Sequence, residues 1–270
     1  MSAEIVKTAI EAARLAGEVL LSEFGHELPV DAHLPHDVKL ELDRRCEAAI
    51  LNRIQTTFPD HGIVSEEIGS LPGSDRYTWY IDPLDGTVNF FHRLPHFCTS
   101  IGCYSKDGEP PLGTPVVGVV YAPALDLLFV GGADRPATVN AQPLSPAGAT
   151  DLSRAMVGLA FSNRNGGAET LGKLATSLAT SAQKVRSFGA TALDICLVAS
   201  GGLGAFIQRG TNSWDLAAGC AVARSAGCTV HLGPHPDRRH RVIVAQPKLF
   251  EAVMDIVRRS TQEPWNAYDS

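Results

Sequence analysis

Acidic residues gather in four short patches of this 270-residue chain, and these patches give the first indication of chemistry. They are Lys39-Leu40-Glu41-Leu42-Asp43, Ser65-Glu66-Glu67, Asp82-Pro83-Leu84-Asp85-Gly86-Thr87 and Trp214-Asp215. The third is the most informative, because its two aspartates directly follow an apolar run that is typical of a buried strand. Burying paired carboxylates is costly unless a cation compensates their charge. A site made only of oxygen atoms suits Mg²⁺ or Mn²⁺ better than zinc.

The same segment carries groups that suit an anion and a water molecule. Pro83 stiffens the turn, so both aspartates and the Leu84 carbonyl can be aimed at one point. Gly86 and Thr87 can begin a helix or tight turn whose free N–H groups face an anion, and the Thr87 hydroxyl can position a water. The spacing equally suits a simple turn in which Asp85 caps a helix.

The other three patches each have a structural interpretation beside the functional one. Glu66 follows an apolar pair and is either a metal ligand at a strand end or part of a solvated turn. Asp215 precedes a run of small residues and is either a helix N-cap or a metal ligand close to a tightly packed helix. Asp43 has the same alternative as a helix cap.

The composition and net charge indicate which classes of protein fit this chain. With 44% hydrophobic and 19% charged residues, the chain is an ordinary globular protein long enough for a large core. A net charge of -6 predicts no nucleic-acid partner. A phosphate ligand would therefore need metal ions, N–H groups or basic side chains nearby to offset the negative charge.

The six cysteines form no CxxC pair and are expected to be buried free thiols. Charged residues interrupt the first apolar segment, which predicts a cytoplasmic protein without a signal peptide or membrane anchor.

The periodicity of apolar residues predicts the elements that must position these patches. Helices are expected over residues 5–20, from 43 into the fifties, and over 168–181, 190–200, 216–226 and 247–259. Strands are expected over 77–81, 99–104, 115–121, 127–130, 155–161, 204–208, 228–232 and 242–245. Loop composition dominates from 131 to 150. Mixed elements in both halves predict a layered α/β or α+β fold.

Taken together, the motifs resemble the inositol monophosphatase family. The matching residues begin with Asp43 and Ser65-Glu66-Glu67, and continue with Asp82-Pro83-Leu84-Asp85-Gly86-Thr87-Val88-Asn89-Phe90. They end with Gly189-Ala190-Thr191-Ala192-Leu193-Asp194 and Trp214-Asp215-Leu216-Ala217-Ala218-Gly219. The resemblance runs from the first helix to about Ala245, and the Asp-Pro-x-Asp-Gly-Thr and Trp-Asp-x-Ala-Ala-Gly pair is highly specific.

The resemblance implies an α-β-α-β-α fold, with residues 1–145 carrying most metal ligands and residues 146–270 supplying Asp215. It implies a lithium-sensitive phosphomonoesterase that binds two or three Mg²⁺ ions, with Mn²⁺ as a possible substitute. The expected ligands are Glu66, Asp82, the Leu84 carbonyl, Asp85 and Asp215. A small phosphate ester is the expected substrate, and a homodimer the expected assembly.

The remaining roles are also carried over from the resemblance. Asp43 and Thr87 would orient the attacking water, with Glu66 beside them, and the Gly86 and Thr87 N–H groups would bind phosphate. The alcohol part of the substrate would lie against the segment Gly189-Ala190-Thr191.

The chain departs from the family pattern at Gln208, seven positions before Asp215, where inositol-specific members carry a glutamate. A neutral amide can still bind a polyol, and it suits a second anionic group better than a carboxylate does. The loop over residues 131–143 also differs from the usual pattern. Inositol monophosphate therefore has rivals as substrate: a 3′-phosphoadenosine nucleotide, fructose bisphosphate and histidinol phosphate.

Two hypotheses of other classes are weighed against the phosphatase. A non-catalytic binding or regulatory protein would be expected to have lost a metal ligand or Thr87, and all are present. A structural calcium protein would show EF-hand spacing, which the sequence lacks.

Overall fold

A computed structural model describes residues 2–26, 30–34, 37–108, 111–146, 149–160, 168–237, 239–261 and 265–268. The N-terminal half is built on a sheet of eight strands with the order β10-β9-β8-β7-β6-β5-β3-β4. Its strands are β3 (Gly62–Ser65), β4 (Gly69–Leu71), β5 (Tyr77–Asp85), β6 (Cys98–Ser105), β7 (Thr114–Ala122), β8 (Leu127–Gly132), β9 (Arg135–Val139) and β10 (Gln142–Pro143). Strands β3 and β5 run parallel, and all other neighbours are antiparallel.

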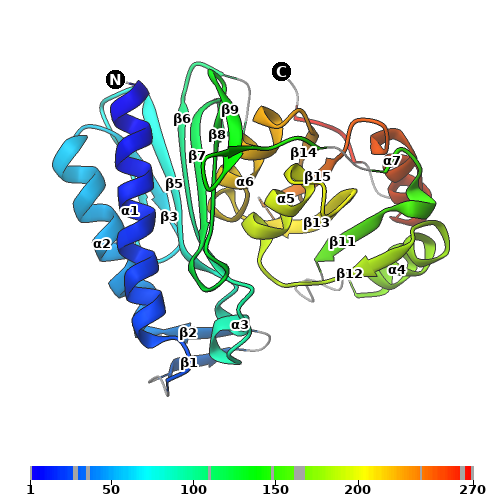
Figure 1. Cartoon of the computed structure of the whole chain (residues 1–270), viewed down its shortest axis with the longest axis horizontal. Coiled ribbons are helices and arrows are strands. Elements are labelled where there is room, and N and C mark those ends of the chain that lie inside the picture. Colours follow the sequence, from blue (N-terminus) through cyan, green and yellow to red (C-terminus); the bar gives the residue numbers. More distant parts are fainter. Residues whose placement is uncertain are drawn as a thin grey trace.

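The C-terminal half is built on a sheet of five strands with the order β12-β11-β13-β15-β14. These are β11 (Met156–Ala160), β12 (Lys184–Arg186), β13 (Ala205–Thr211), β14 (Thr229–Pro234) and β15 (His240–Ala245). A separate hairpin of β1 (Val30–Leu34) and β2 (Asp37–Leu40) lies near the short helix α3 (Thr87–Phe91), as Figure 1 shows. The predicted boundary at residue 145 falls between β10 and β11.

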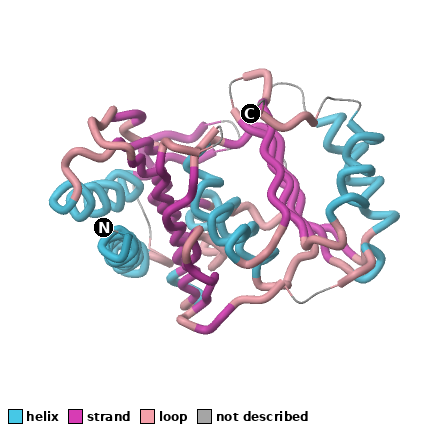
Figure 2. The backbone as a smooth tube through the Cα atoms, turned by 90° about the horizontal axis from the view of Figure 1, so that it is seen from above, coloured by secondary structure: helices cyan, strands magenta, loops and turns pink. Residues whose placement is uncertain are grey.

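Helices cover both sheets and fill the space between them (Figures 1 and 2). Helices α1 (Ser2–Glu23) and α2 (Glu41–Thr57) pack on the outer face of the eight-stranded sheet. Helices α4 (Ala168–Ser181) and α7 (Phe250–Thr261) pack on the outer face of the five-stranded sheet. Helices α5 (Thr191–Ala199) and α6 (Ser213–Ser225) form the middle layer. The predicted α-β-α-β-α architecture is confirmed.

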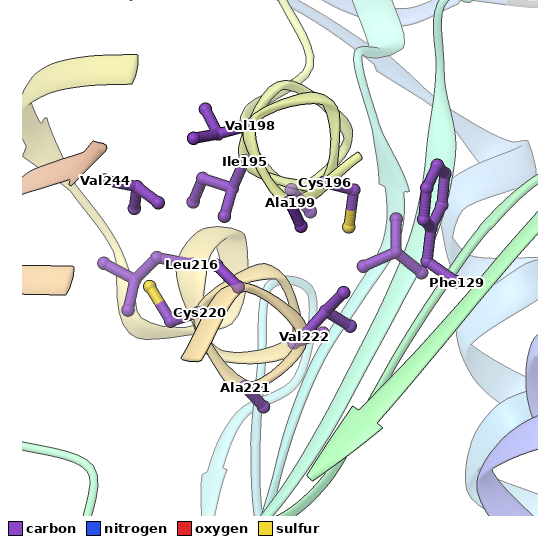
Figure 3. Packing of buried hydrophobic residues seen from close by; sticks show 14 of the residues in the cluster. Phe129, Ile195, Cys196, Val198, Ala199, Leu216, Cys220, Ala221, Val222 and Val244 are labelled. Atoms are coloured by element: carbon purple, nitrogen blue, oxygen red, sulfur yellow. The ribbon is translucent and has the colours of Figure 1, made fainter. Parts of the chain in front are cut away.

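The middle layer is apolar all round because both of its faces are covered. In Figure 3, α5 and α6 lie between Phe129 of the larger sheet and Val244 of the smaller one. Close contact with the larger sheet depends on small residues. A Cβ atom on Gly118 would lie only 2.2 Å from the Ala218 carbonyl oxygen of α6. Small residues on both sides thus let α6 bring its N-terminus, with Asp215, close to the sheet.

Several sequence predictions need correction. The segment from 131 to 150 contains the strands β9 and β10, which its loop-like composition hid. The short strands β1, β2, β4 and β12 were not predicted either, because they are too short to show a period. Helix α3 begins at Thr87, where a helix or tight turn was expected. All six cysteines are free and buried, as expected. In the described part of the chain, no helix is long and apolar enough to cross a membrane.

Candidate functional site

A bulge in β5 places the two aspartates of the central motif on one side of the sheet. Asp82 pairs with Ser100 of β6 and Asp85 pairs with Cys98, so three steps along β5 match two along β6. In a regular strand, residues three apart point to opposite faces, and one extra residue brings them to the same face. Pro83 lies within the bulge, where its missing N–H breaks no ladder hydrogen bond.

Asp85 also caps a helix, although that helix lies more than a hundred positions further along the chain. Its Oδ1 accepts the Thr191 N–H at 3.0 Å, and its Oδ2 accepts the Ala192 N–H at 2.7 Å. These are the first N–H groups of α5, which have no partner within the helix. Asp85 can therefore be both a helix cap and a metal ligand. Its two hydrogen bonds also connect the larger sheet to α5 of the middle layer.

Asp215 is not the N-cap of α6, as its sequence context suggested, because Asn212 takes that place; Asp215 is the third helical residue and the acidic partner of a capping box. It stands in the first turn of α6, where Oδ2 accepts the Asn212 N–H at 2.9 Å as part of a capping box. The same oxygen accepts the Thr211 hydroxyl at 2.9 Å. These bonds fix the carboxylate at the entrance to the helix.

Glu66 lies in the turn that follows β3. Its N–H donates to the Ile81 carbonyl at 3.3 Å, so the turn is fastened to β5 at the residue before Asp82. The side chain is half-buried rather than fully solvated.

These residues meet around one pocket of about 170 Å³. It is lined by Glu66, Asp82, Leu84, Asp85, Gly86, Thr87, Val88, Gly189 and Asp215. Every predicted metal ligand is in this set, with two of the predicted phosphate and substrate contacts and Thr87. Because the ligands come from the turn after β3, from β5 and from α6, only the folded chain brings them together.

Four predicted site residues lie outside the lining of this pocket. Asp43 is buried in the first turn of α2, near enough for its charge to act on Asp82. Ala190 is the N-cap residue of α5. The Thr191 hydroxyl donates to Oε1 of Gln208 in β13 at 2.8 Å, so these two form one hydrogen-bonded unit behind α5.

The turn at Gly86 requires a glycine. Its φ of 90° is in the left-handed region, and a Cβ atom there would lie 3.0 Å from the His96 carbonyl oxygen. The turn directs Thr87 back toward the strand, and the Thr87 hydroxyl donates to the Leu84 carbonyl at 2.9 Å.

Burial dominates the electrostatics of the pocket, and repulsion between carboxylates adds to it at Asp82 and Asp85. Burial raises the pKa of Asp82 well above its ordinary value, and the charge of Glu66 is the next contribution. Burial also raises the pKa of Asp85, followed by the charge of Asp215. The pKa of Asp215 is raised by burial despite the hydrogen bonds it accepts. A cation in the pocket would relieve these costs.

The donor set fits a hard divalent cation. It consists of four carboxylates and one carbonyl, all oxygen, which is the ligand type that Mg²⁺ and Mn²⁺ prefer. In the described ranges, no three acidic, histidine or cysteine side chains are close enough to form a ready-made metal-binding group.

Two residues that support the site were not predicted. Asn89 donates to the carbonyls of His96 and Phe188, each at 2.7 Å, and so joins the segment after α3 to the loop before α5. Asn89 could have been suspected from the sequence because it lies within the motif from Asp82 to Phe90. Glu47 is a buried carboxylate one helical turn after Asp43, and that four-residue spacing was the signal.

Comparison with known proteins agrees with this geometry. The model of the inositol monophosphatase family matches residues 1–262. The chain belongs to the inositol monophosphatase family. Inositol monophosphatase 1 of Solanum lycopersicum is 33% identical over 95% of this chain and 96% of its own length. Nus factor SuhB of Pseudomonas aeruginosa is 32% identical over 94% and 96%.

The fold is shared as well. The crystal structure of the extragenic suppressor protein suhB from Bartonella henselae superimposes with a TM-score of 0.87 and 26% identity. That match covers 95% of this chain and 99% of the other. As a member of the inositol monophosphatase family, the chain is a metal-dependent hydrolase of phosphoric monoesters.

Proposed function

We propose that this chain is a Mg²⁺-dependent phosphomonoesterase that hydrolyses a small polyol or sugar phosphate, such as myo-inositol monophosphate. The observation that carries the proposal is the single pocket lined by Glu66, Asp82, Leu84, Asp85 and Asp215, with Gly86 and Thr87 at its edge. A pocket walled by carboxylates repels a phosphate unless cations are present, so phosphate and metal must bind together.

Glu66, Asp82, Asp85 and the Leu84 carbonyl would hold one cation, and Asp82, Asp85 and Asp215 would hold a second. A third, weaker cation would sit near Glu66. When bound, the cations supply Lewis-acid activation of a water and neutralise the phosphate and the leaving alkoxide. Asp82 and Asp85 would contribute to both cation sites, so the bulge that places them on one face is the most important local feature.

Thr87 and Asp43 would orient the attacking water by hydrogen bonding, for an in-line displacement without a phospho-enzyme. The Thr87 hydroxyl donates to the Leu84 carbonyl, and its lone pairs stay available to a water. The N–H groups of Gly86 and Thr87 would hold phosphate oxygens. Gly86 suits this role because its bare Cα leaves the backbone accessible.

Gly189, Ala190 and Thr191 would border the alcohol part of the substrate, with Gln208 behind them. The Oε1 atom of Gln208 is engaged by Thr191, so the amide nitrogen is the end that is left to meet the substrate. An amide nitrogen donates hydrogen bonds and therefore favours hydroxyl or phosphate oxygens over a cationic amine. This ranks histidinol phosphate below the polyol and bisphosphate substrates.

Phosphate release from a panel of substrates tests the proposal. Metal-free protein would be assayed with and without Mg²⁺ on myo-inositol 1-phosphate, fructose 1,6-bisphosphate, 3′-phosphoadenosine 5′-phosphate and histidinol phosphate. We expect strictly Mg²⁺-dependent turnover, inhibition by Li⁺, and the highest kcat/KM on the inositol ester. A preference for a bisphosphate would keep the chemistry and replace the substrate. Turnover that is indifferent to Mg²⁺ would contradict the proposal itself.

We also propose that the protein is a cytoplasmic homodimer. Light scattering coupled to size-exclusion chromatography measures the assembly directly, with a mass of twice 28.7 kDa expected. Elution as a monomer at every concentration would contradict this.

A further inference from the structure

Glu47 is a buried carboxylate that the proposed chemistry does not use. It lies on α2, one turn after Asp43, and only 2% of its surface is exposed. It does not line the pocket that holds the candidate metal ligands. A carboxylate in this position costs stability unless hydrogen bonds compensate it, so its partners indicate what it does.

All the hydrogen bonds that the structure assigns to Glu47 come from one turn. Its Oε1 accepts a short hydrogen bond from the Ser65 hydroxyl. The same oxygen accepts the Glu67 N–H at 3.2 Å and the Ile68 N–H at 3.4 Å. The three donors flank Glu66 on both sides. Glu47 thus holds the turn that carries a candidate metal ligand, without touching that ligand's side chain in any of these contacts.

The Glu66 backbone is held from the opposite side as well. Its own N–H donates to the Ile81 carbonyl of β5, at the residue before Asp82. The turn is therefore fastened between β5 and α2. One anchor fixes it relative to Asp82, and the other stops the rest of the turn from swinging away toward the solvent, where Ile68 is already 42% exposed.

A purely structural role is the competing explanation. Replacing a buried charge by an apolar side chain of similar size is often neutral or stabilising, so stability alone gives little reason for a carboxylate here. The three donors offer another reason, because a charged acceptor can gather several N–H and O–H groups at one point. That geometry orders a short turn, and Glu66 is the residue in it that reaches the pocket.

We infer that Glu47 is a positioning residue that sets the affinity of the site for divalent cations by fixing the turn of Glu66. The inference rests on the proposed role of Glu66 as a metal ligand. Partners that orient a ligand typically contribute 10–100-fold to metal affinity. Because Glu47 contacts neither the phosphate-binding turn nor Thr87, its loss should act on metal affinity and leave kcat at saturating Mg²⁺ nearly unchanged.

Mg²⁺ binding by isothermal titration calorimetry, with full-length metal-free protein, tests this inference. Glu47→Ala should weaken Mg²⁺ binding about tenfold or more. Glu47→Gln keeps an acceptor oxygen and should recover part of the affinity, and Ser65→Ala should weaken binding a few-fold. Glu41→Gln is the matched control, because it makes the same chemical change on an exposed position of the same helix and should change nothing.

Kinetics separates positioning from general damage. We expect the Mg²⁺ concentration for half-maximal activity to rise in Glu47→Ala, with the substrate KM and kcat at saturating Mg²⁺ within about twofold of the parent. If Glu47→Ala does not fold, Glu47→Gln and Ser65→Ala carry the test. Unchanged Mg²⁺ affinity in both of them, or a loss of kcat that Mg²⁺ does not restore, would overturn the inference.

Glu66→Gln distinguishes this failure from failure of the proposed function. If Glu66→Gln weakens Mg²⁺ binding strongly while the Glu47 and Ser65 variants do not, only the positioning role is wrong. If Glu66→Gln itself leaves Mg²⁺ binding and activity unchanged, Glu66 is no ligand and the proposed site fails with it.

Discussion

At the scale of single residues, the site depends on carboxylates that are placed at a cost. Asp82 is 2% exposed and lies among Glu66, Asp85 and Asp215, whose charges all raise its pKa. No protein cation is among the causes that shift the pKa of Asp82. Such an arrangement is favourable only when a cation occupies the pocket. The carboxylates that give the pocket its affinity for metal therefore lower the stability of the metal-free protein.

Asp82→Asn should change the stability of the metal-free protein and its affinity for Mg²⁺ in opposite directions. Asparagine keeps the acceptor that receives the Leu84 N–H, but removes one of the repelling charges. We expect the metal-free variant to melt a few degrees higher than the metal-free parent, at ~2–4 °C per kcal/mol. Mg²⁺ binding and phosphatase activity should fall by more than about a hundredfold, because an amide is a weak ligand for Mg²⁺. Thermal unfolding and calorimetry report the two effects separately.

The control is Asp255→Asn, on the exposed face of α7 and far along the chain from the motif. It should alter neither the melting temperature nor Mg²⁺ binding. If the metal-free Asp82→Asn protein is less stable than the parent, the charge of Asp82 does not destabilise the metal-free pocket.

Gly86→Ala tests the turn between the strand and Thr87. The new Cβ would need a left-handed φ and would lie 3.0 Å from the His96 carbonyl oxygen. We expect a loss of more than about 1 kcal/mol of unfolding free energy, together with most of the activity. Chemical denaturation and a phosphate assay measure both.

Gly172→Ala is a matched comparison in the exposed interior of α4. Its Cβ would meet nothing within 4 Å, so it should stabilise by about 0.5–1 kcal/mol and leave activity intact. Equal effects of the two substitutions would argue against a special conformation at Gly86.

At the scale of elements, long periodic segments were predictable and short ones were not. The helix expected over 168–181 is α4, residue for residue, because fourteen residues carry a clear apolar period. The β9–β10 hairpin was hidden because β9 contains Pro136 and β10 is only two residues long, so neither shows an alternation. The link from Asp85 to α5 was beyond prediction from pattern, since it joins residues more than a hundred positions apart. The acidic motifs themselves could be recognised in the sequence, because each consists of neighbouring residues. That the motifs come together in one pocket depends on the fold.

His61, just before β3, should make stability depend on pH. Its Nδ1 accepts the Trp79 N–H at 2.9 Å, and burial lowers its pKa, with the charges of Asp75 and Asp60 acting in the opposite direction. The unfolded chain therefore takes up this proton first as the pH falls. The stabilising contribution is present above the ordinary value of about 6.5 and is lost as the pH drops through and below it.

Unfolding free energies measured between pH 7.5 and 5 check this expectation. Toward pH 5, the parent should lose stability relative to His61→Asn, and His61→Asn should be the less stable of the two at pH 7.5. His26→Asn, at an exposed position, should keep the slope of the parent. A slope that is the same in all three proteins would exclude His61 as its source.

At the scale of the whole molecule, the pocket joins the two halves. Glu66, Asp82 and Asp85 come from the eight-stranded half, whereas Asp215 comes from the other. A cation bound at the proposed site would therefore connect the halves and would bind the folded chain alone. Mg²⁺ at one hundred times its dissociation constant should add about 2.7 kcal/mol of stability.

Differential scanning calorimetry in EDTA and in excess Mg²⁺ measures this linkage. We expect a melting temperature ~5–10 °C higher with Mg²⁺. Asp215→Asn, which removes the contribution of the C-terminal half, should lose most of that increase. An increase of the same size in Asp215→Asn would mean that the stabilising cations bind elsewhere.

In the proposed function, acidic side chains from distant segments hold divalent cations in one pocket beside Thr87. Anomalous scattering from crystals grown with Mn²⁺ tests it most directly, because it locates the metal without assuming its ligands. We expect two or three Mn²⁺ peaks, each within bonding distance of carboxylate oxygens from Glu66, Asp82, Asp85 and Asp215 or of the Leu84 carbonyl. Peaks only at other positions, with these carboxylates directed into solvent, would contradict it.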